Sequence, residues 1–173
     1  AHFHMVMGVS PVLVLFAAIY HWFPKISGKM FDEGLGKIHF WGTFLGTYAI
    51  YLPMHYIGAL GVPRRYFALG TTDFIPESAF ELNAAITVAA VFVAAVQIVF
   101  FINVFKSLWN GEKSDPNPWE ATSLEWQTPD NPPRHGNWGL HLPVVYRWAY
   151  EYATPGVKEG FVPQTVAPAD VVM

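Results

Sequence analysis

Three long runs of apolar residues dominate the first part of the chain. They cover Met5–Pro24, Ile38–Gly61 and Ala84–Phe105, and none of them contains Asp, Glu, Lys or Arg. Each run has roughly 20 or more residues, enough for a helix to cross a hydrocarbon core about 30 Å thick. The runs are too long for buried strands, and a membrane bundle tolerates Pro11 and Pro53 as kinks. The pattern therefore predicts an all-α membrane protein with three transmembrane helices.

Small and polar side chains inside the runs predict how the helices pack. Gly42 and Gly46 form a G-x-x-x-G step in the second run, which favours a close approach of two helices. Gln97 and Asn103 lie in the third run, where we expect them to form hydrogen bonds between helices. A packing role like that of the glycines is expected for three small residues of the third run: Ala85, Ala89 and Ala90.

The last part of the chain has a different character. Residues 111–173 are rich in Pro, Trp and Tyr and contain no apolar run long enough to span a bilayer. This composition is too aromatic for pure disorder, and it favours an extended, partly ordered segment laid on a partner surface. We therefore expect a transmembrane helical part at residues 1–110 and a tail at residues 111–173.

Basic residues predict the orientation of the helices. The loop 25–37 holds three lysines, and the segment after the third run holds five basic residues: Lys106, Lys113, Arg134, Arg147 and Lys158. The loop between the second and third runs holds only Arg64 and Arg65. Under the positive-inside rule, the first loop and the tail lie on the cytoplasmic side. The arginine pair lies on the opposite side, against this rule, and requires another explanation.

Composition supports the membrane assignment and excludes several functions. The chain is 53% hydrophobic and 13% charged, whereas soluble domains carry about 25% charged residues. The net charge is -3, without a basic cluster, so nucleic-acid binding has no electrostatic support. Cysteine is absent, which excludes disulfides, zinc–thiolate sites and iron–sulfur clusters. A channel or transporter is disfavoured because the apolar runs lack charged residues.

Two histidines at the start of the first run are candidate metal ligands. His2 and His4 belong to the string Ala1-His2-Phe3-His4. Residues two apart on a helix point in nearly opposite directions, so the two rings suit two centres better than one. Imidazole is a standard axial ligand of heme iron. On spacing alone, a pair of interfacial histidines at a helix end remains the better interpretation.

The remaining histidines and the arginine pair carry weaker signals. Arg64 and Arg65 suit carboxylates such as heme propionates, but lipid phosphates are an equal alternative. His21 and His39 flank the inner loop, so we expect them at the membrane interface. His55 lies close to the arginines in sequence, where an interfacial place or a role at a heme edge is open.

Several strings together resemble subunit I of the cytochrome c oxidases, in the heme-copper oxidase family. These strings are AHFH (1–4), HWFPK (21–25), GKIHFW (36–41), PMHYIGALGVPRRY (53–66) and TSLEW (122–126). They occur in the family's order and at about its spacing, and the resemblance covers most of residues 1–126. The chain departs from the family pattern at Met5, where the family often has Tyr, and in the loop 71–82.

The resemblance implies roles for four residues. It places the three helices as the tenth, eleventh and twelfth of a twelve-helix subunit. His2 corresponds to the ligand of the high-spin heme a3 at the catalytic, oxygen-reducing centre, and His4 to one ligand of the low-spin heme a. Arg64 and Arg65 correspond to the pair that contacts heme propionates, which would explain their position against the charge rule.

The resemblance also implies what lies outside this chain. We interpret Ala1 as a truncation point, with the ligands of copper B upstream and copper A in a partner subunit. The implied function is proton-pumping electron transfer from cytochrome c to oxygen, in a bacterial plasma membrane. The implied partners are the remainder of subunit I, subunits II and III, cytochrome c and the lipid bilayer. The alternatives are a quinol oxidase of the same superfamily and a three-helix anchor without a redox role.

Overall fold

The computed structural model describes residues 1–65, 73–130, 132–133, 137–151 and 162–167. Its helices begin with a π-helical segment, η1 (His4–Val9), which continues directly into α1 (Ser10–Ser27). The long helices α2 (Glu33–Ala59) and α3 (Glu77–Asn110) follow, and the tail contains a short 3-10 helix, η3 (Leu124–Trp126). The predicted helical class is thus confirmed for the described residues.

The junction of η1 and α1 reflects the proline next to it. Pro11 is the second residue of α1 and follows the π-helical segment directly. A proline has no N–H group, and its ring clashes with the carbonyl four residues earlier, so regular α-helical bonding is excluded there. Single turns of π-helix are rare and occur frequently at functional sites. Here the π-helical segment begins at His4, one of the two candidate ligands.

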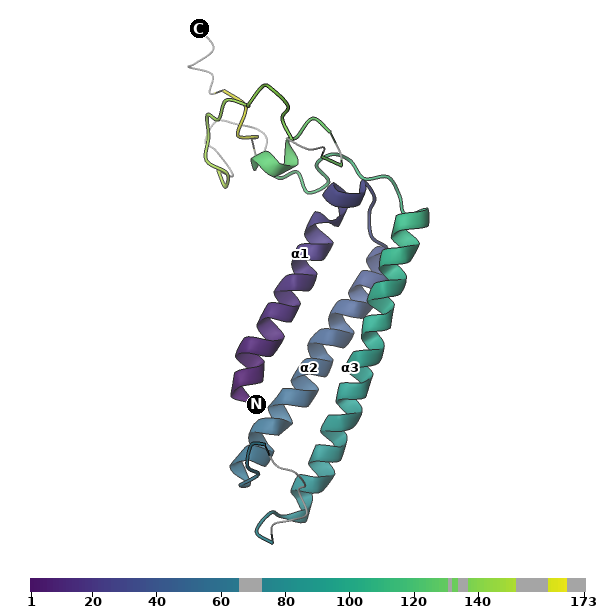
Figure 1. Cartoon of the computed structure of the whole chain (residues 1–173), viewed down its shortest axis with the longest axis vertical. Helices are drawn as coiled ribbons and strands as arrows, with labels where there is room; N and C mark the ends of the chain where they lie inside the picture. The colour runs from purple at the N-terminus through teal and green to yellow at the C-terminus, as the bar shows by residue number, and fades with distance from the viewer. Residues whose placement is uncertain (66–72, 131, 134–136, 152–161, 168–173) are drawn as a thin grey trace. The chain divides into compact units, whose positions relative to one another are not determined.

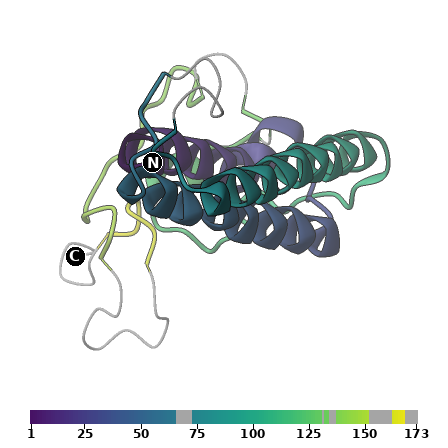
Figure 2. The ribbon, with the colours of Figure 1, turned by 90° about the horizontal axis from the view of Figure 1, so that it is seen from below.

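The chain divides into two compact units. We call residues Ala1–Ala18 together with Asp32–Lys106 the helical unit, and residues Ile19–Phe31 together with Ser107–Met173 the tail unit. Within the helical unit, η1 and the first half of α1 form one continuous rod, which runs alongside α2 and α3 (Figure 1; Figure 2).

Close packing of α2 on α3 confirms the prediction from the glycine step. A Cβ atom built on Gly42 would lie 2.9 Å from both γ-methyl groups of Val96, and one on Gly46 would collide with Val93. Neither position has room for a larger side chain without displacement of a valine. The alanines of the third apolar run do not show the same close packing within this chain, where Ala85 and Ala90 are exposed.

In the tail unit, the end of α1 and the loop after it pair with the tail. The amide of Met30 donates to Glu112 O at 2.9 Å, and the amide of Ser114 donates to Gly28 O at 2.9 Å. Gly111, directly after α3, lies against Met30, where a Cβ would be 2.9 Å from its carbonyl oxygen. The tail residues described here therefore fold onto residues 19–31 rather than running free.

Among the residues that the structure describes, two helical stretches are long and apolar enough to cross a membrane: His4–Ser27, with 24 residues, and Glu77–Asn110, with 34 residues. Among the described helices, α2 does not meet the same criterion. Its first turns carry Glu33 and Lys37, and its apolar stretch is diluted by glycine, tyrosine and histidine. The prediction of three spanning helices is thus supported by length and composition for two of them, and it stays a prediction for α2.

Candidate functional site

The two candidate ligands lie exposed at the start of the helical unit. His2 and His4 are both exposed, and neither ring forms a hydrogen bond within the described residues. Their ring nitrogens are therefore free to coordinate iron. The described residues contain no group of three or more His, Asp or Glu side chains that could enclose a metal ion. A single imidazole nitrogen is a standard axial ligand of heme iron, so each of these two side chains fits that group.

The ring of His4 packs between two aromatic side chains. Its plane stacks on Tyr51 of α2, with ring centroids 5.7 Å apart and an angle of 15° between the planes. Phe3 approaches the same ring edge-on from its own helix, at 5.4 Å and 84°. His4 is thereby held by a face contact from a neighbouring helix and an edge contact from its own.

Arg64 and Arg65 lie in the turn that follows α2. Both are exposed, and neither guanidinium forms an ion pair or hydrogen bond with a described residue. Arg65 has a φ of 59°, a left-handed conformation that costs a non-glycine residue about 1–3 kcal/mol. Such backbone strain persists where the surroundings fix it and is common at ligand-binding sites.

The arginine pair and the histidines lie toward the same end of the helical unit. The chain's N-terminus is near the end of α2 in Figure 1. Tyr51, which contacts His4, precedes the end of α2 at Ala59 by eight residues, about 12 Å along a helix axis. The arginines, which follow α2, are thus further along the chain direction of α2 than the contact between Tyr51 and His4.

The expectation that His39 lies at the membrane interface is wrong, because its side chain is buried between helices. It is only 2% exposed and lies between the rings of Phe16 and Phe100, at centroid distances of 4.6 and 5.1 Å. Its Nε2 donates to Gln97 Oε1 at 3.1 Å, and the Gln97 amide donates to Thr43 Oγ1 at 3.1 Å. The prediction that Gln97 forms interhelical hydrogen bonds is confirmed.

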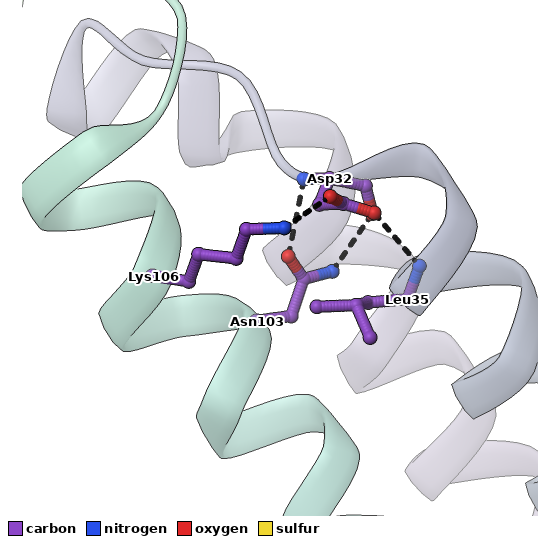
Figure 3. Close-up of polar contacts among 4 residues, drawn as sticks. All are labelled: Asp32, Leu35, Asn103 and Lys106. Atoms are coloured by element: carbon purple, nitrogen blue, oxygen red, sulfur yellow. Dashed lines mark hydrogen bonds and ion pairs between the residues drawn. The ribbon is translucent and has the colours of Figure 1, made fainter.

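Asp32 joins the start of α2 to α3, as Figure 3 shows. Its Oδ1 caps α2 by accepting from Leu35 N at 2.9 Å, and its Oδ2 accepts from Lys106 Nζ at 2.6 Å. Asn103, fully buried, accepts from the Asp32 amide at 3.1 Å and donates to the Asp32 carbonyl at 3.0 Å. The hydrogen bond from Lys106, together with the Leu35 amide, lowers the pKa of Asp32. The predicted interhelical role of Asn103 is confirmed.

Aromatic side chains gather at the end of α1 in the tail unit. His21 stacks on Trp119 at 5.9 Å, and the Trp119 indole donates to the His21 carbonyl at 3.0 Å. Lys25 is 5% exposed, and its Nζ lies 5.7 Å from the ring centroid of the buried Trp126. The Lys25 ammonium and the Trp126 indole N–H are buried donors without a hydrogen-bond partner among the residues that the structure describes.

Sequence reasoning missed Tyr51, Asp32 and Lys25. An aspartate directly before a long helix is a standard N-cap signal, so the role of Asp32 was accessible. The stacking of Tyr51 on His4 joins positions 47 residues apart and has no local signal. In the sequence, Lys25 has the pattern of an interfacial lysine. Its burial could not be predicted because it depends on Trp126, which is distant along the chain.

Comparison with known proteins identifies a family to which this chain is similar. Residues 1–93 match the model of the family described as "Cytochrome C and Quinol oxidase polypeptide I". Over 168 residues, or 97% of this chain, it is 61% identical to "Alternative cytochrome c oxidase subunit 1" of Bradyrhizobium diazoefficiens, of which it covers 28%.

More distant relatives carry similar names. The chain is 46% identical to "Cytochrome c oxidase subunit 1" of Synechocystis over 76% of its length, covering 23% of that protein. It is 40% identical to "Probable cytochrome c oxidase subunit 1-beta" of Nocardia farcinica over 92% of its length, covering 27% of it. The chain therefore spans about a quarter of the length of these relatives.

Proposed function

Because this chain belongs to the family of cytochrome c and quinol oxidase polypeptide I, we propose that it forms the heme-ligating end of a terminal respiratory oxidase. The complete complex would take electrons from cytochrome c, pass them through a low-spin heme to a heme–copper centre, reduce oxygen to water and pump protons. The names of the relatives support cytochrome c rather than a quinol as the donor.

The observation that carries this proposal is the pair of exposed histidine rings on one helical turn, neither of which has a hydrogen bond to a described residue. His2 would hold the iron of the high-spin heme a3 and His4 the iron of the low-spin heme a. Two positions apart on a helix, the rings leave on nearly opposite faces, so each can serve a separate centre. Heme iron, when bound, supplies the one-electron chemistry that His, Arg and Tyr side chains lack.

Arg64 and Arg65 have the role of anion binders in this proposal. Their guanidinium groups are unpaired within the described residues and fixed on a strained turn. Propionates are carboxylates, and an arginine fork binds a carboxylate through two parallel hydrogen bonds. Each such charged hydrogen bond is worth about 1.5–3 kcal/mol. The pair thus compensates propionate charge at the end of the bundle opposite to the lysine-rich loop.

The remainder of the site belongs to other chain segments. Copper B ligands would come from the rest of subunit I, and copper A would lie in a partner subunit. We further propose subunits II and III and cytochrome c as partners. The family is integral to the membrane; a bacterial plasma membrane, α2 as a third span, and a tail on the cytoplasmic side follow from the charge pattern.

Purification of the complete oxidase that contains this chain tests the proposal. We expect two hemes per subunit I by pyridine hemochrome, and oxygen uptake driven by ferrocytochrome c but not by a quinol. Membranes washed with alkaline carbonate should retain the subunit. A preparation without heme, or one released by carbonate, would contradict the assignment. Turnover with quinol alone would replace cytochrome c by the quinol alternative.

A further inference from the structure

The ring of Tyr51 stacks on the ring of His4. The family resemblance implies no role for Tyr51. The two rings lie 5.7 Å apart and only 15° from parallel. Tyr51 is half-buried on α2, while His4 is exposed on η1. The contact therefore covers one face of the imidazole and leaves its ring nitrogens uncovered.

A histidine side chain does not fix the plane of its own ring. The last side-chain torsion of histidine is broad, so the ring rotates unless a neighbour limits it. The free nitrogens of His4 have no hydrogen bond to a described residue that could supply this limit. The face of Tyr51 and the perpendicular edge of Phe3 are the contacts that restrict rotation. An aromatic pair of this kind is worth about 0.5–1.5 kcal/mol.

Tyr51 is itself held in place by its own helix. His55, one turn later on α2, donates from Nδ1 to the Tyr51 carbonyl at 2.7 Å. Pro53 lies between the two, inside α2, and interrupts regular backbone bonding. The missing Pro53 N–H affects the carbonyl of residue 49, one turn before Pro53. The His55 ring adds a donor to the Tyr51 carbonyl itself, which reinforces the backbone that carries Tyr51.

We propose that Tyr51 is a positioning residue that sets the plane of the His4 imidazole and thereby the orientation of an axial ligand of the low-spin heme. The inference rests on the proposed function, in which His4 ligates that heme. It is specific to the aromatic ring: the phenol hydroxyl takes no part in the stacking contact. Phenylalanine at position 51 should therefore serve as well, whereas an aliphatic residue should not.

Low-temperature EPR of the oxidised, purified oxidase tests this inference. The principal g values of a low-spin ferric heme depend on the planes of its axial imidazoles. We expect Tyr51→Leu to shift the largest g value beyond the line width, and Tyr51→Phe to leave it unchanged. Tyr56→Leu is the matched control, because Tyr56 is an exposed tyrosine of the same helix. Tyr51→Met, an aliphatic variant longer and more flexible than leucine, replaces Tyr51→Leu if that variant does not assemble.

Two results would overturn the inference. One is a wild-type EPR spectrum in Tyr51→Leu, or in Tyr51→Met where the leucine variant does not assemble. The other is a shift in Tyr51→Phe as large as that in the aliphatic variant. The proposed function fails separately, if a His4→Leu oxidase keeps its low-spin heme. A normal low-spin heme in the wild type, lost in His4→Leu but unaltered in the aliphatic variant, would reject the role of Tyr51 alone.

Discussion

In the helical unit, the buried side chains of His39, Thr43 and Asn103 all form hydrogen bonds between segments far apart in the sequence. In the tail unit, buried Gln164 also forms such hydrogen bonds, but the buried donors of Lys25 and Trp126 form none with the described residues. The ammonium of Lys25 instead lies over the indole face of Trp126. One unit compensates buried polarity with hydrogen bonds, and the other does so in part with an aromatic ring.

The difference follows from the surroundings that the sequence predicts for each unit. An unpaired polar group costs several kcal/mol in hydrocarbon, so a helix bundle in a membrane has to satisfy its polar side chains internally. Lys25 and Trp126 themselves lie outside the apolar runs, where a cation over an aromatic ring contributes about 0.5–2 kcal/mol. Polar residues in the helical unit should therefore be less replaceable than those in the tail unit.

The largest effect on stability should come from Asn103. Asn103→Leu removes the acceptor of the Asp32 amide and one of two donors to the Asp32 carbonyl, which keeps its bond from Gly36 N. A backbone donor left unpaired away from water costs about 1–3 kcal/mol. We expect a loss of about 2 kcal/mol or more, measured as a lower thermal midpoint of the assembled oxidase. Asn110→Leu is the control, because Asn110 is exposed at the end of the same helix. Equal effects of the two variants would contradict the role of Asn103.

Close packing in the helical unit should give a somewhat smaller effect. Gly46→Val forces a branched side chain against Val93, and overpacking of this kind costs about 1–3 kcal/mol. Gly58→Ala provides the contrast, because a Cβ at Gly58 meets nothing within 4 Å. Alanine there should raise helix stability by about 0.5–1 kcal/mol. Thermal midpoints that move in the same direction for both variants would refute the packing account.

Replacement of the tail unit's buried lysine should be tolerated. Lys25→Met keeps the length of the side chain and removes an ammonium without a hydrogen-bond partner among the described residues. It loses the contact with Trp126 and the attraction to Glu125. Since these changes oppose each other, we expect the stability to move by no more than about 1 kcal/mol. A loss comparable to that of Asn103→Leu would show that Lys25 has a partner in the complete complex, and the contrast between the units would fail.

The smallest effect concerns pH. The pKa of Asp32 is lowered by the hydrogen bond from Lys106, so its contribution to stability is present above the unfolded pKa near 3.8 and is lost as the pH falls through the folded value. The contribution is small because both side chains are partly exposed. Asp32→Asn should keep a helix cap and remove this acid sensitivity. An unchanged acid dependence of the thermal midpoint in Asp32→Asn would contradict the assignment.

The sequence predicts the helical unit better than the tail unit for physical reasons. Apolar runs mark the parts of helices that suit hydrocarbon, so α2 and α3 were expected but their starts at Glu33 and Glu77 were not. The glycine step at Gly42 is a local pattern and was interpreted correctly. His39 was not, because its partner Gln97 lies 58 residues away.

The candidate site shows the same division. His2, His4 and the arginine pair were identified from short strings in the sequence, and their roles stay predictions until tested. Tyr51 could not be identified, because its contact with His4 depends on how η1 packs against α2. In the tail, the burial of Trp126 depends on pairing between the tail and residues 19–31, which leaves no periodic signal.

The central claim, that His2 and His4 ligate two different hemes, is tested most directly by reduced-minus-oxidised spectra of the complete oxidase. We expect His4→Leu to lose the low-spin heme signal and His2→Leu to disturb carbon monoxide binding at the high-spin heme. His141→Leu, which changes an exposed histidine of the tail, should leave both signals intact. Normal spectra in both ligand variants, or loss of the same low-spin signal in both, would contradict the claim.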